Sequence, residues 1–306
     1  MEVLNKNHKK CNCFWFCECC LDITLLNIRK NINGILSYEI DALNEYDHLG
    51  GRIFDNKLIE YCLKQFCLET GNKEENVRKD KRAYKRLKTK CEKAKELLIF
   101  SKEEAIIYID NYFGKNNLCI KITRDKFDQL CKDIYDKIKE LILGFLDDIP
   151  KNINDIDDII LVGNSARISG VRNCLKTLFG EEKIKDYLNP EEVVCYGATI
   201  EASKMEKEDK ANYDLKDINE YNLGIEIINP DVNDAKKNGN LLYTIIKKHS
   251  KIPSFNEGKF RCETNKDFPK ILINIYEGND KYINKNEYLG KICIDNLVNL
   301  EFLIIM

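Results

Sequence analysis

The sequence lacks an excess of charge of either sign and lacks any long apolar run. Its 49 basic and 51 acidic residues leave a formal net charge of −2, which gives no general electrostatic reason to expect binding to nucleic acid or to an anionic membrane. No apolar stretch approaches the ~20 residues of a membrane span, and the polar start MEVLNKNHKK does not lead into the apolar region of a secretion signal. We therefore expect a cytoplasmic protein that binds neither nucleic acid nor membrane, with a length of about two domains.

Cysteine is abundant, with 14 residues. A chain of this size without a secretion signal is not expected to have a disulfide framework. Five cysteines cluster at positions 11, 13, 17, 19 and 20. Such a cluster could hold zinc, but a second cysteine pair at a familiar distance is missing. We expect reduced thiols in a poorly ordered segment, and no metal.

Strands and helices alternate up to about residue 205. The segments DITLLNI and GILSYEIDAL have the alternation of strands. The basic segment 78–98 invites a nucleic-acid interpretation, but its apolar residues recur with a helical period. That stripe predicts an amphipathic helix with a solvated lysine face. Its members are Ala83, Leu87, Cys91, Ala94 and Leu98.

Further along, two strands precede one long helix over residues 123–148. The strand IILV, the turn GNSA and the helix VRNCLKTLF come next. Asn189, Pro190 and Glu192 then supply an N-cap, a first-turn proline and an acid at the third position, which predicts a helix start. This alternation predicts an α/β domain.

The pattern changes after residue 205. Residues 205–222 are charged and predict a linker, and only strand-like pieces follow, which predicts an all-β module. The module ends on a bare apolar strand, so we expect it to be cut short. Four isoleucines are candidates for core or peptide contact, with core favoured. They are Ile245, Ile246, Ile271 and Ile273.

Several segments resemble the Hsp70 chaperone family, in family order and spacing. They are HLGGRIFDN, LKTKCEKAKELL, ITRDKFDQL, IDDIILVGNSARI, NPEEVVCYGATIEA, LGIEI, KIPS and IYEGND. The resemblance implies an α/β lobe of the actin-like ATPase fold, namely lobe II of the nucleotide-binding domain, followed by a truncated peptide-binding β-sandwich. It predicts a divergent cysteine-rich segment at 1–20, lobe II at 21–204, the linker at 205–222 and the sandwich at 223–306. The first lobe and the helical lid have no counterpart.

The resemblance also implies ATP or ADP with Mg²⁺ as cofactor, and it assigns nucleotide contacts by position. Glycine at 163 permits close approach and positive φ, Ser165 can donate and accept hydrogen bonds, and Arg167 can stack on a base. The bland alternative is a strand-turn-helix kept only for folding. The assigned contacts are Gly50, Gly51, Glu92, Lys95, Gly163, Asn164, Ser165, Arg167 and Glu191.

The chain departs from the family pattern around the base. Asn164 stands where the family has a glycine, although asparagine tolerates positive φ better than most residues. Glu96 replaces the arginine that faces the adenine, and Ile99 replaces a serine. Half of the expected contacts to the base are therefore missing.

The phosphate-binding hairpin departs further. The family places glycines before Asp22, whereas this chain has WFCECC, without the glycines whose amides would hold phosphates. Glu18 brings a negative charge there, and like charges about 4 Å apart repel by roughly 4 kcal/mol at an effective dielectric of 20. Asp22 is the one cation-coordinating acid retained and the one catalytic candidate. We expect no ATP hydrolysis by this chain alone.

Two main functions follow from these observations, and a zinc-binding protein built on the cysteine cluster is a third, less favoured one. The first is an Hsp70-type chaperone relative that binds ATP, unfolded polypeptides and co-chaperones, with impaired catalysis. The second is a degenerate, non-enzymatic interaction module. The charged linker residues 214–218 replace a docking run of leucines, so we expect weak coupling between nucleotide and peptide binding.

Overall fold

The computed structural model describes residues 8–100, 104–149, 152–185, 187–206, 213–228, 231–261, 270–295 and 301–305. The chain divides into two compact units, the first formed by residues 1–36 and 44–213 and the second by residues 37–43 and 214–306. Within the described residues, no helix has the length and apolarity needed to cross a bilayer.

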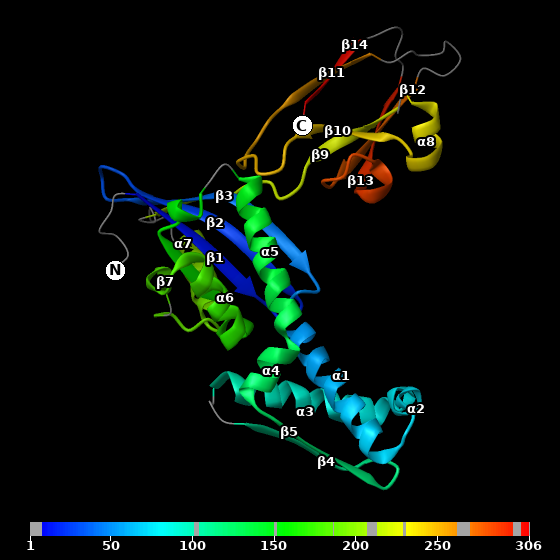
Figure 1. Ribbon diagram of the computed structural model, residues 1–306. Helices are drawn as coiled ribbons and strands as arrows, with labels where there is room; N and C mark the ends of the chain where they lie inside the picture. Colours follow the sequence, from blue (N-terminus) through cyan, green and yellow to red (C-terminus); the bar gives the residue numbers. More distant parts are fainter. Residues whose placement is uncertain are drawn as a thin grey trace. The chain divides into compact units, whose positions relative to one another are not determined.

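The first unit contains a mixed sheet and a set of helices (Figure 1). Its main elements are β1 (His8–Phe16), β2 (Cys20–Lys30), β3 (Leu36–Asp47, shared with the second unit), α1 (Gly51–Thr70), α2 (Glu74–Lys79), α3 (Lys81–Phe100), β4 (Ala105–Phe113), β5 (Asn116–Ile122), α4 (Arg124–Leu130), α5 (Lys132–Asp148), β6 (Asp158–Val162), the 3₁₀ turn η2 (Asn164–Arg167), α6 (Ser169–Phe179), β7 (Ile184–Lys185) and α7 (Val193–Glu206).

Strand β1 is central to the sheet, whose order here is β7-β6-β1-β2-β3. It pairs antiparallel with β2 and parallel with β6, so that Phe14 lies opposite Ile23 on one side and Leu161 on the other. Asn12, Phe14 and Phe16 are buried at every second position, while Trp15 between the last two is 42% exposed. This is the period-two alternation of a strand with one face in the core.

The prediction of a poorly ordered cysteine-rich start is therefore wrong for the described residues of this segment. The strand was not predicted because its buried alternate positions, Asn12, Phe14 and Phe16, include an amide, so that the letters CNCFWF show no alternation of polar and apolar residues. Two hydrogen-bonding neighbours then place β1 inside the sheet.

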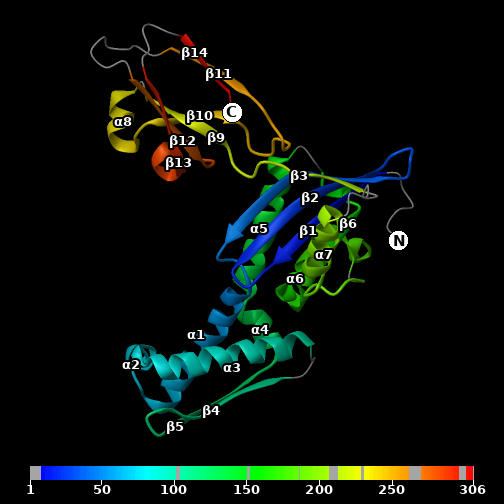
Figure 2. The same ribbon diagram turned by 180° about the vertical axis from the view of Figure 1, so that it is seen from behind.

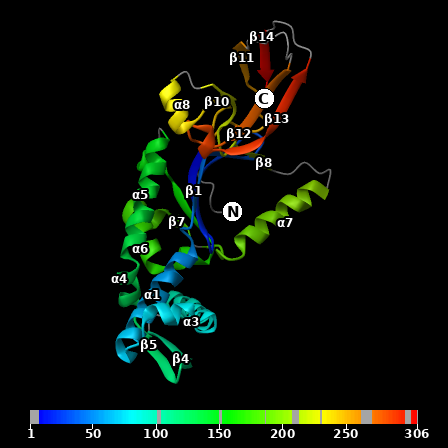
Figure 3. The ribbon, with the colours of Figure 1, turned by 90° about the vertical axis from the view of Figure 1, so that its right-hand side faces the viewer.

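Figure 3 shows the sheet nearly edge-on, with α5 and α6 on one side and α7 on the other. Seen from either side in Figures 1 and 2, α1, α2, α3 and α4 gather with the hairpin β4–β5 at one end of the unit. The predicted apolar stripe of α3 is buried at all five positions, from Ala83 to Leu98, as predicted. It packs against α1 and β4.

Two helix boundaries differ from the sequence prediction. The single helix expected over 123–148 is divided at Cys131, whose φ of −99° and ψ of 6° end α4 before α5 begins. An N-cap at Asn189 would start the helix at Pro190, whereas α7 begins at Val193. There the amides of Glu192 and Val193 both donate to the Asn189 carbonyl oxygen, so that a tight turn precedes the helix.

The second unit is mainly β-structure. Ile245, Ile246, Ile271 and Ile273 are buried together with Ile225, as predicted for core residues. The expectation of an all-β module is wrong in one respect, since a short helix, α8, lies between two strands. Its sheet has the order β10-β9-β12-β13, and β11 pairs separately with β14. The elements are β8 (Tyr213–Lys216), β9 (Leu223–Ile227), α8 (Val232–Asn238), β10 (Leu241–Ile246), β11 (Glu257–Arg261), β12 (Lys270–Glu277), β13 (Glu287–Asp295) and β14 (Glu301–Ile305).

The expected linker contains ordered structure. Residues 207–212 lie outside the described part of the chain, but Tyr213–Lys216 forms strand β8 beside β3. The buried carboxylate of Glu39 accepts hydrogen bonds from Lys216 Nζ at 2.8 Å and Lys251 Nζ at 3.2 Å. These bonds lower the pKa of Glu39 to about 2, against the opposing effect of burial.

We expect Glu39→Gln to remove a pH-dependent part of the stability of the second unit. A carboxylate with a lowered folded-state pKa stabilises the fold above its unfolded value of about 4.5 and loses that contribution as the pH falls towards about 2. Because both lysines are half exposed, the loss at neutral pH should be only about 1–2 kcal/mol. Urea unfolding at neutral pH and near pH ~3 measures it, with exposed Glu287→Gln as control. An equal effect of both variants would contradict the assignment.

Candidate functional site

A cavity of about 480 Å³ lies in the first unit. Four segments line it: the β1–β2 turn, the start of α1, one face of α3 and the turn after β6. The α3 residues follow one another at three- and four-residue spacing, which places them on one helical face. The lining residues are Phe16, Cys17, Glu18, Gly51, Asp55, Glu92, Lys95, Glu96, Ile99, Gly163, Asn164 and Ser165.

The start of α1 is bonded to the β1–β2 turn. The amide of Gly51 donates to Cys17 O at 2.9 Å, and the amide of Arg52 donates to Glu18 O at 2.8 Å. A Cβ atom at Gly50 would lie 2.5 Å from Cys19 N, so glycine is required for this approach. Free amides at a helix start can hold an anion. Here the turn already occupies two of them.

The turn after β6 is held against β1. Gly163 has φ of 83° and ψ of 152°, and a Cβ there would lie 2.2 Å from Phe16 O. Its amide donates to Pro190 O at 2.8 Å. The following residues form η2, which buries Ser165 and Ala166. Positive φ and close backbone contact both require glycine here.

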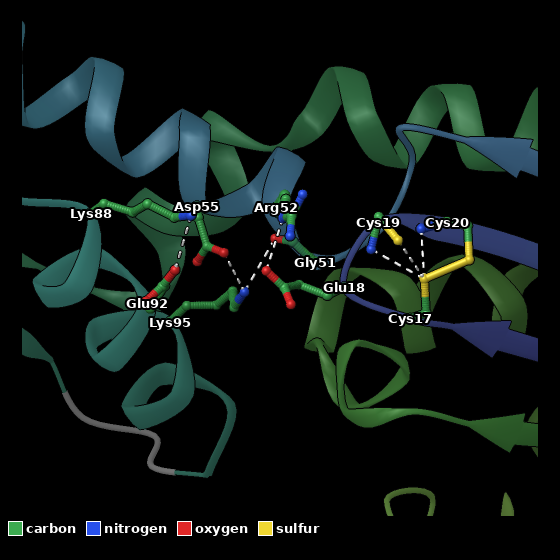
Figure 4. A network of polar contacts seen from close by, with 10 residues as sticks. All are labelled: Cys17, Glu18, Cys19, Cys20, Gly51, Arg52, Asp55, Lys88, Glu92 and Lys95. Carbon is green, nitrogen blue, oxygen red and sulfur yellow. Dashed lines mark hydrogen bonds and ion pairs between the residues drawn. A yellow bond between two sulfur atoms is a disulfide. The ribbon is translucent and has the colours of Figure 1, made fainter. Parts of the chain in front are cut away.

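Lys95 and Asp55 form an ion pair in the wall of the cavity (Figure 4). Lys95 Nζ donates to Asp55 Oδ2 at 2.7 Å and to Gly51 O at 3.1 Å, and the two side chains are only 12% and 4% exposed. Burial raises the pKa of Asp55, while Lys95 opposes the rise. Within the described residues, the second oxygen, Asp55 Oδ1, is buried without a hydrogen-bond partner.

Asn164 presents a second such acceptor, because its Oδ1 atom is also buried and has no partner in the described structure. Buried acceptors without a donor carry a free-energy cost of about 1–3 kcal/mol. Both atoms are enclosed by the wall of the cavity, so only a rearrangement of these side chains would present them to a ligand.

The charge of Glu18 is compensated, although the sequence led us to treat it as isolated. Glu18 Oε1 accepts from Arg52 Nε at 2.8 Å (Figure 4). That hydrogen bond lowers the pKa of Glu18 and raises the pKa of Arg52. The two side chains are 63% and 58% exposed, so the pair contributes little to stability.

The structure brings together six of the nine predicted nucleotide contacts. They are Gly51, Glu92, Lys95, Gly163, Asn164 and Ser165. Gly50 lies beside the cavity, under the β1–β2 turn. Glu191 is exposed outside the lining, with its amide donating to Asn189 Oδ1 at 3.2 Å.

Arg167 and Asp22 also lie outside the lining. Arg167 Nη2 donates to Asn189 Oδ1 at 2.9 Å, and its guanidinium carbon is 5.7 Å from the centre of the Phe100 ring. The arginine thus ties η2 to the turn before α7 instead of facing the cavity. Asp22, the catalytic candidate, is half-buried, and its Oδ2 atom lies 3.7 Å from Cys20 Sγ.

Both departures from the family pattern, Glu96 and Ile99, lie on the cavity wall. Three further lining residues, Asp55, Phe16 and Cys17, were not predicted from the sequence. Asp55 follows Gly51 by one helical turn, which would have placed the two residues on the same face. For Phe16 and Cys17 no local pattern in the sequence gave a signal.

The β1–β2 turn also contains a disulfide between Cys17 and Cys20, whose Cα atoms are 5.3 Å apart. The expectation that all cysteines are reduced is therefore wrong for this pair. Cys17 contributes to the cavity wall. The disulfide therefore lies in the same turn whose carbonyl oxygens are hydrogen-bonded to the start of α1.

Comparisons with known proteins identify the family of the chain. The chain matches the sequence model of the family described as Hsp70 protein over residues 4–300. It is 29% identical over 273 residues to heat shock cognate 70 kDa protein 3 of Dictyostelium discoideum, an alignment that covers 88% of this chain and 40% of that protein. The chain thus spans less than half the length of this curated relative. The predicted resemblance is confirmed, and the chain belongs to the Hsp70 family.

Proposed function

We propose that the cavity binds the nucleoside part of an adenine nucleotide and that the chain alone does not hydrolyse ATP. The observation that carries the proposal is that six of the nucleotide contacts assigned by the resemblance line one cavity, among them Asn164 and Ser165. The hydroxyl groups of a ribose and the amino group of adenine are donors that match the carboxylates of its lining. Phosphate oxygens at neutral pH are acceptors and do not.

The charges around the cavity support the same choice. Four carboxylates and one ammonium group are among the described lining residues, and that ammonium, Lys95, is already paired with Asp55. The start of α1 has two of its amides occupied by the hairpin. A bound Mg²⁺ ion would supply positive charge to a phosphate chain, and carboxylates such as Glu18 and Glu92 are of the ligand type it takes. The nucleoside needs no such ion.

The domain assignments extend this proposal. We assign residues 21–204 to the second ATPase lobe and residues 223–306 to a peptide-binding sandwich, on the order and spacing of the family segments. The family consists of ATP-dependent chaperones, so unfolded polypeptides and co-chaperones are the proposed partners. Because Ile245, Ile246, Ile271 and Ile273 form the core, peptide contacts would fall on other residues of the unit.

We expect Glu96→Arg to tighten ADP binding by roughly tenfold. The change replaces a carboxylate on the cavity wall with a planar guanidinium that can stack on the adenine, an interaction that contributes about 1 kcal/mol or more. Glu96 is exposed on α3, so the fold should tolerate the change. Calorimetric titration with ADP, for the unchanged chain and the variant, measures the affinity.

Glu69→Arg is the matched control, since it makes the same charge change at an exposed position of α1 outside the cavity. Equal tightening by both variants would indicate general attraction of the anion and contradict the assigned site. No heat of binding in any of the three proteins, with native circular dichroism, would overturn the nucleotide proposal. Turnover of ATP by the unchanged chain, abolished by Asp22→Ala, would overturn the second half of the proposal.

A second candidate function, a non-enzymatic interaction module, is favoured by α7. Val194, Tyr196 and Ile200 on this helix are each about half exposed, at 46%, 53% and 58%. Several apolar side chains in contact with water on one helix are typical of a protein interface. Failure of nucleotide binding in a folded chain would make this the leading function.

A further inference from the structure

Three cysteine sulfurs converge on the β1–β2 turn. The Sγ atoms of Cys17, Cys19 and Cys20 all lie within 4.8 Å of one another, and Cys17 Sγ is 3.5 Å from Cys19 Sγ. Figure 4 shows the three side chains grouped on the turn, apart from the Lys95–Asp55 pair. All three cysteines lie within residues 17–20, so the conformation of this turn alone sets the arrangement of their sulfurs.

The backbone of the turn points two hydrogen-bond donors at one of these sulfurs. The amide of Cys19 donates to Cys17 Sγ at 3.1 Å, and the amide of Cys20 donates to the same atom at 2.7 Å. Donors aimed at a sulfur favour its thiolate over its thiol. The thiolate is the form of cysteine that binds metals. The turn is therefore built to hold a negative sulfur at position 17.

The separation of Cys17 Sγ and Cys19 Sγ is close to that of two ligands on one soft cation. Two thiolates bound to one tetrahedral zinc, each about 2.3 Å from it, lie about 3.8 Å apart, close to the separation of Cys17 and Cys19. Cys17 and Cys20 also have the C-x-x-C spacing of structural zinc ligands. Thiolates select zinc and Cu(I) over hard cations such as Mg²⁺.

We propose that the reduced turn binds one zinc ion through Cys17, Cys19 and Cys20, with the fourth coordination position open. The disulfide form and the metal form exclude each other because they use the same sulfurs. Two molecules of a small thiol, such as glutathione, reduce the Cys17–Cys20 bond and leave as their own disulfide. Zinc then displaces the three thiol protons, which are released to solvent. This inference does not depend on the proposed binding of nucleotide.

The other cysteines of the described structure do not offer such a site. Burial raises the pKa of Cys11 to about 12 and that of Cys13 to about 11, which opposes the thiolate in both. Cys119 and Cys195 are exposed, but they belong to β5 and α7. Neither is part of a metal-type cluster among the described residues.

The test is zinc titration of the whole chain after reduction and removal of the reductant without oxygen. A chromophoric chelator that competes for zinc reports the stoichiometry and the affinity. We expect one equivalent of zinc per chain, with binding at least about a hundredfold weaker in Cys17→Ser, since loss of a ligand should exceed the 10–100-fold effect of an outer-shell partner. Cys119→Ser should bind like the unchanged chain.

A second cluster, Cys20 with Asp22 and Glu45, shares one sulfur with the proposed site and provides a discriminating variant. We expect Asp22→Asn to retain zinc and Cys19→Ser to lose it. The reverse result would overturn the proposal and place the ion on the carboxylates. Absence of stoichiometric binding in the reduced chain would overturn it as well.

A readout on the unchanged chain guards against variants that fail to fold. Alkylation with iodoacetamide, with and without zinc, is followed by peptide mass spectrometry. We expect zinc to protect Cys17, Cys19 and Cys20 while Cys119 reacts equally in both samples. Equal labelling of the three turn cysteines in the presence and absence of zinc would contradict the proposed site.

Discussion

Truncation of Phe14 to alanine is expected to destabilise the first unit by about 3–5 kcal/mol, the usual loss for a fully buried phenylalanine. Phe14 has no exposed surface, and its ring centre is 5.9 Å from that of Phe179 on α6. It lies between Ile23 of β2 and Leu161 of β6. The truncation leaves a cavity between β2, β6 and α6. These elements have little freedom to close around it, because all three are fixed by backbone hydrogen bonds.

The neighbouring residue supplies the control. Trp15 lies on the same strand, points to the opposite face and is 42% exposed, so Trp15→Ala should change the free energy of unfolding by only about 1 kcal/mol. Urea unfolding followed by far-ultraviolet circular dichroism compares the two variants. Similar effects of the two truncations would show that β1 is not a core strand and would restore the interpretation of a loosely ordered start.

Periodicity predicted those elements whose two faces differ in composition. The five apolar positions of α3 stand out against a lysine-rich background and are all buried. β1 was missed because its buried alternate positions are Asn12, Phe14 and Phe16, of which the first is polar. A pattern of hydrophobicity cannot reveal a strand whose inner face includes a buried amide. In the fold, β1 is defined by its pairing with β6, a strand that is distant in the sequence.

The candidate site was predictable where backbone conformation demands a residue type. Gly50 and Gly163 lie where backbone atoms of neighbouring segments leave no room for a side chain, and both follow from the motif positions. Arg167 was assigned to the base, yet it donates to Asn189. The direction of a long side chain depends on a partner 22 residues away, which no local pattern specifies. The Asp55–Lys95 pair connects two helices and was overlooked for the same reason.

Substitution of Gly163 by alanine is expected to destabilise the first unit by about 3 kcal/mol or more and to abolish ADP binding. The observed φ of 83° with ψ of 152° is a backbone conformation that residues other than glycine adopt only at a cost of about 1–3 kcal/mol. The new Cβ would also lie 2.2 Å from Phe16 O, an atom of the backbone of a core strand. To relieve the overlap, η2 must move away from β1, and Asn164 and Ser165 move with it. The acceptor and the hydroxyl that line the cavity would then be displaced.

The contrast with Gly144→Ala separates this effect from a general consequence of replacing glycine. Gly144 lies within α5, and a Cβ there would meet nothing within 4 Å, so alanine should stabilise the helix by about 0.5–1 kcal/mol and leave ADP binding unchanged. Trp15 is the one tryptophan of the chain, and its Cδ1 atom lies 3.2 Å from the position that a Cβ at Gly163 would occupy, so its fluorescence should respond to Gly163→Ala alone. A Gly163→Ala protein with unchanged stability would mean that the turn can relax away from Phe16. Retention of ADP binding in that protein would place the nucleoside elsewhere, because the cavity assigned to it depends on the contact between Gly163 and the end of β1.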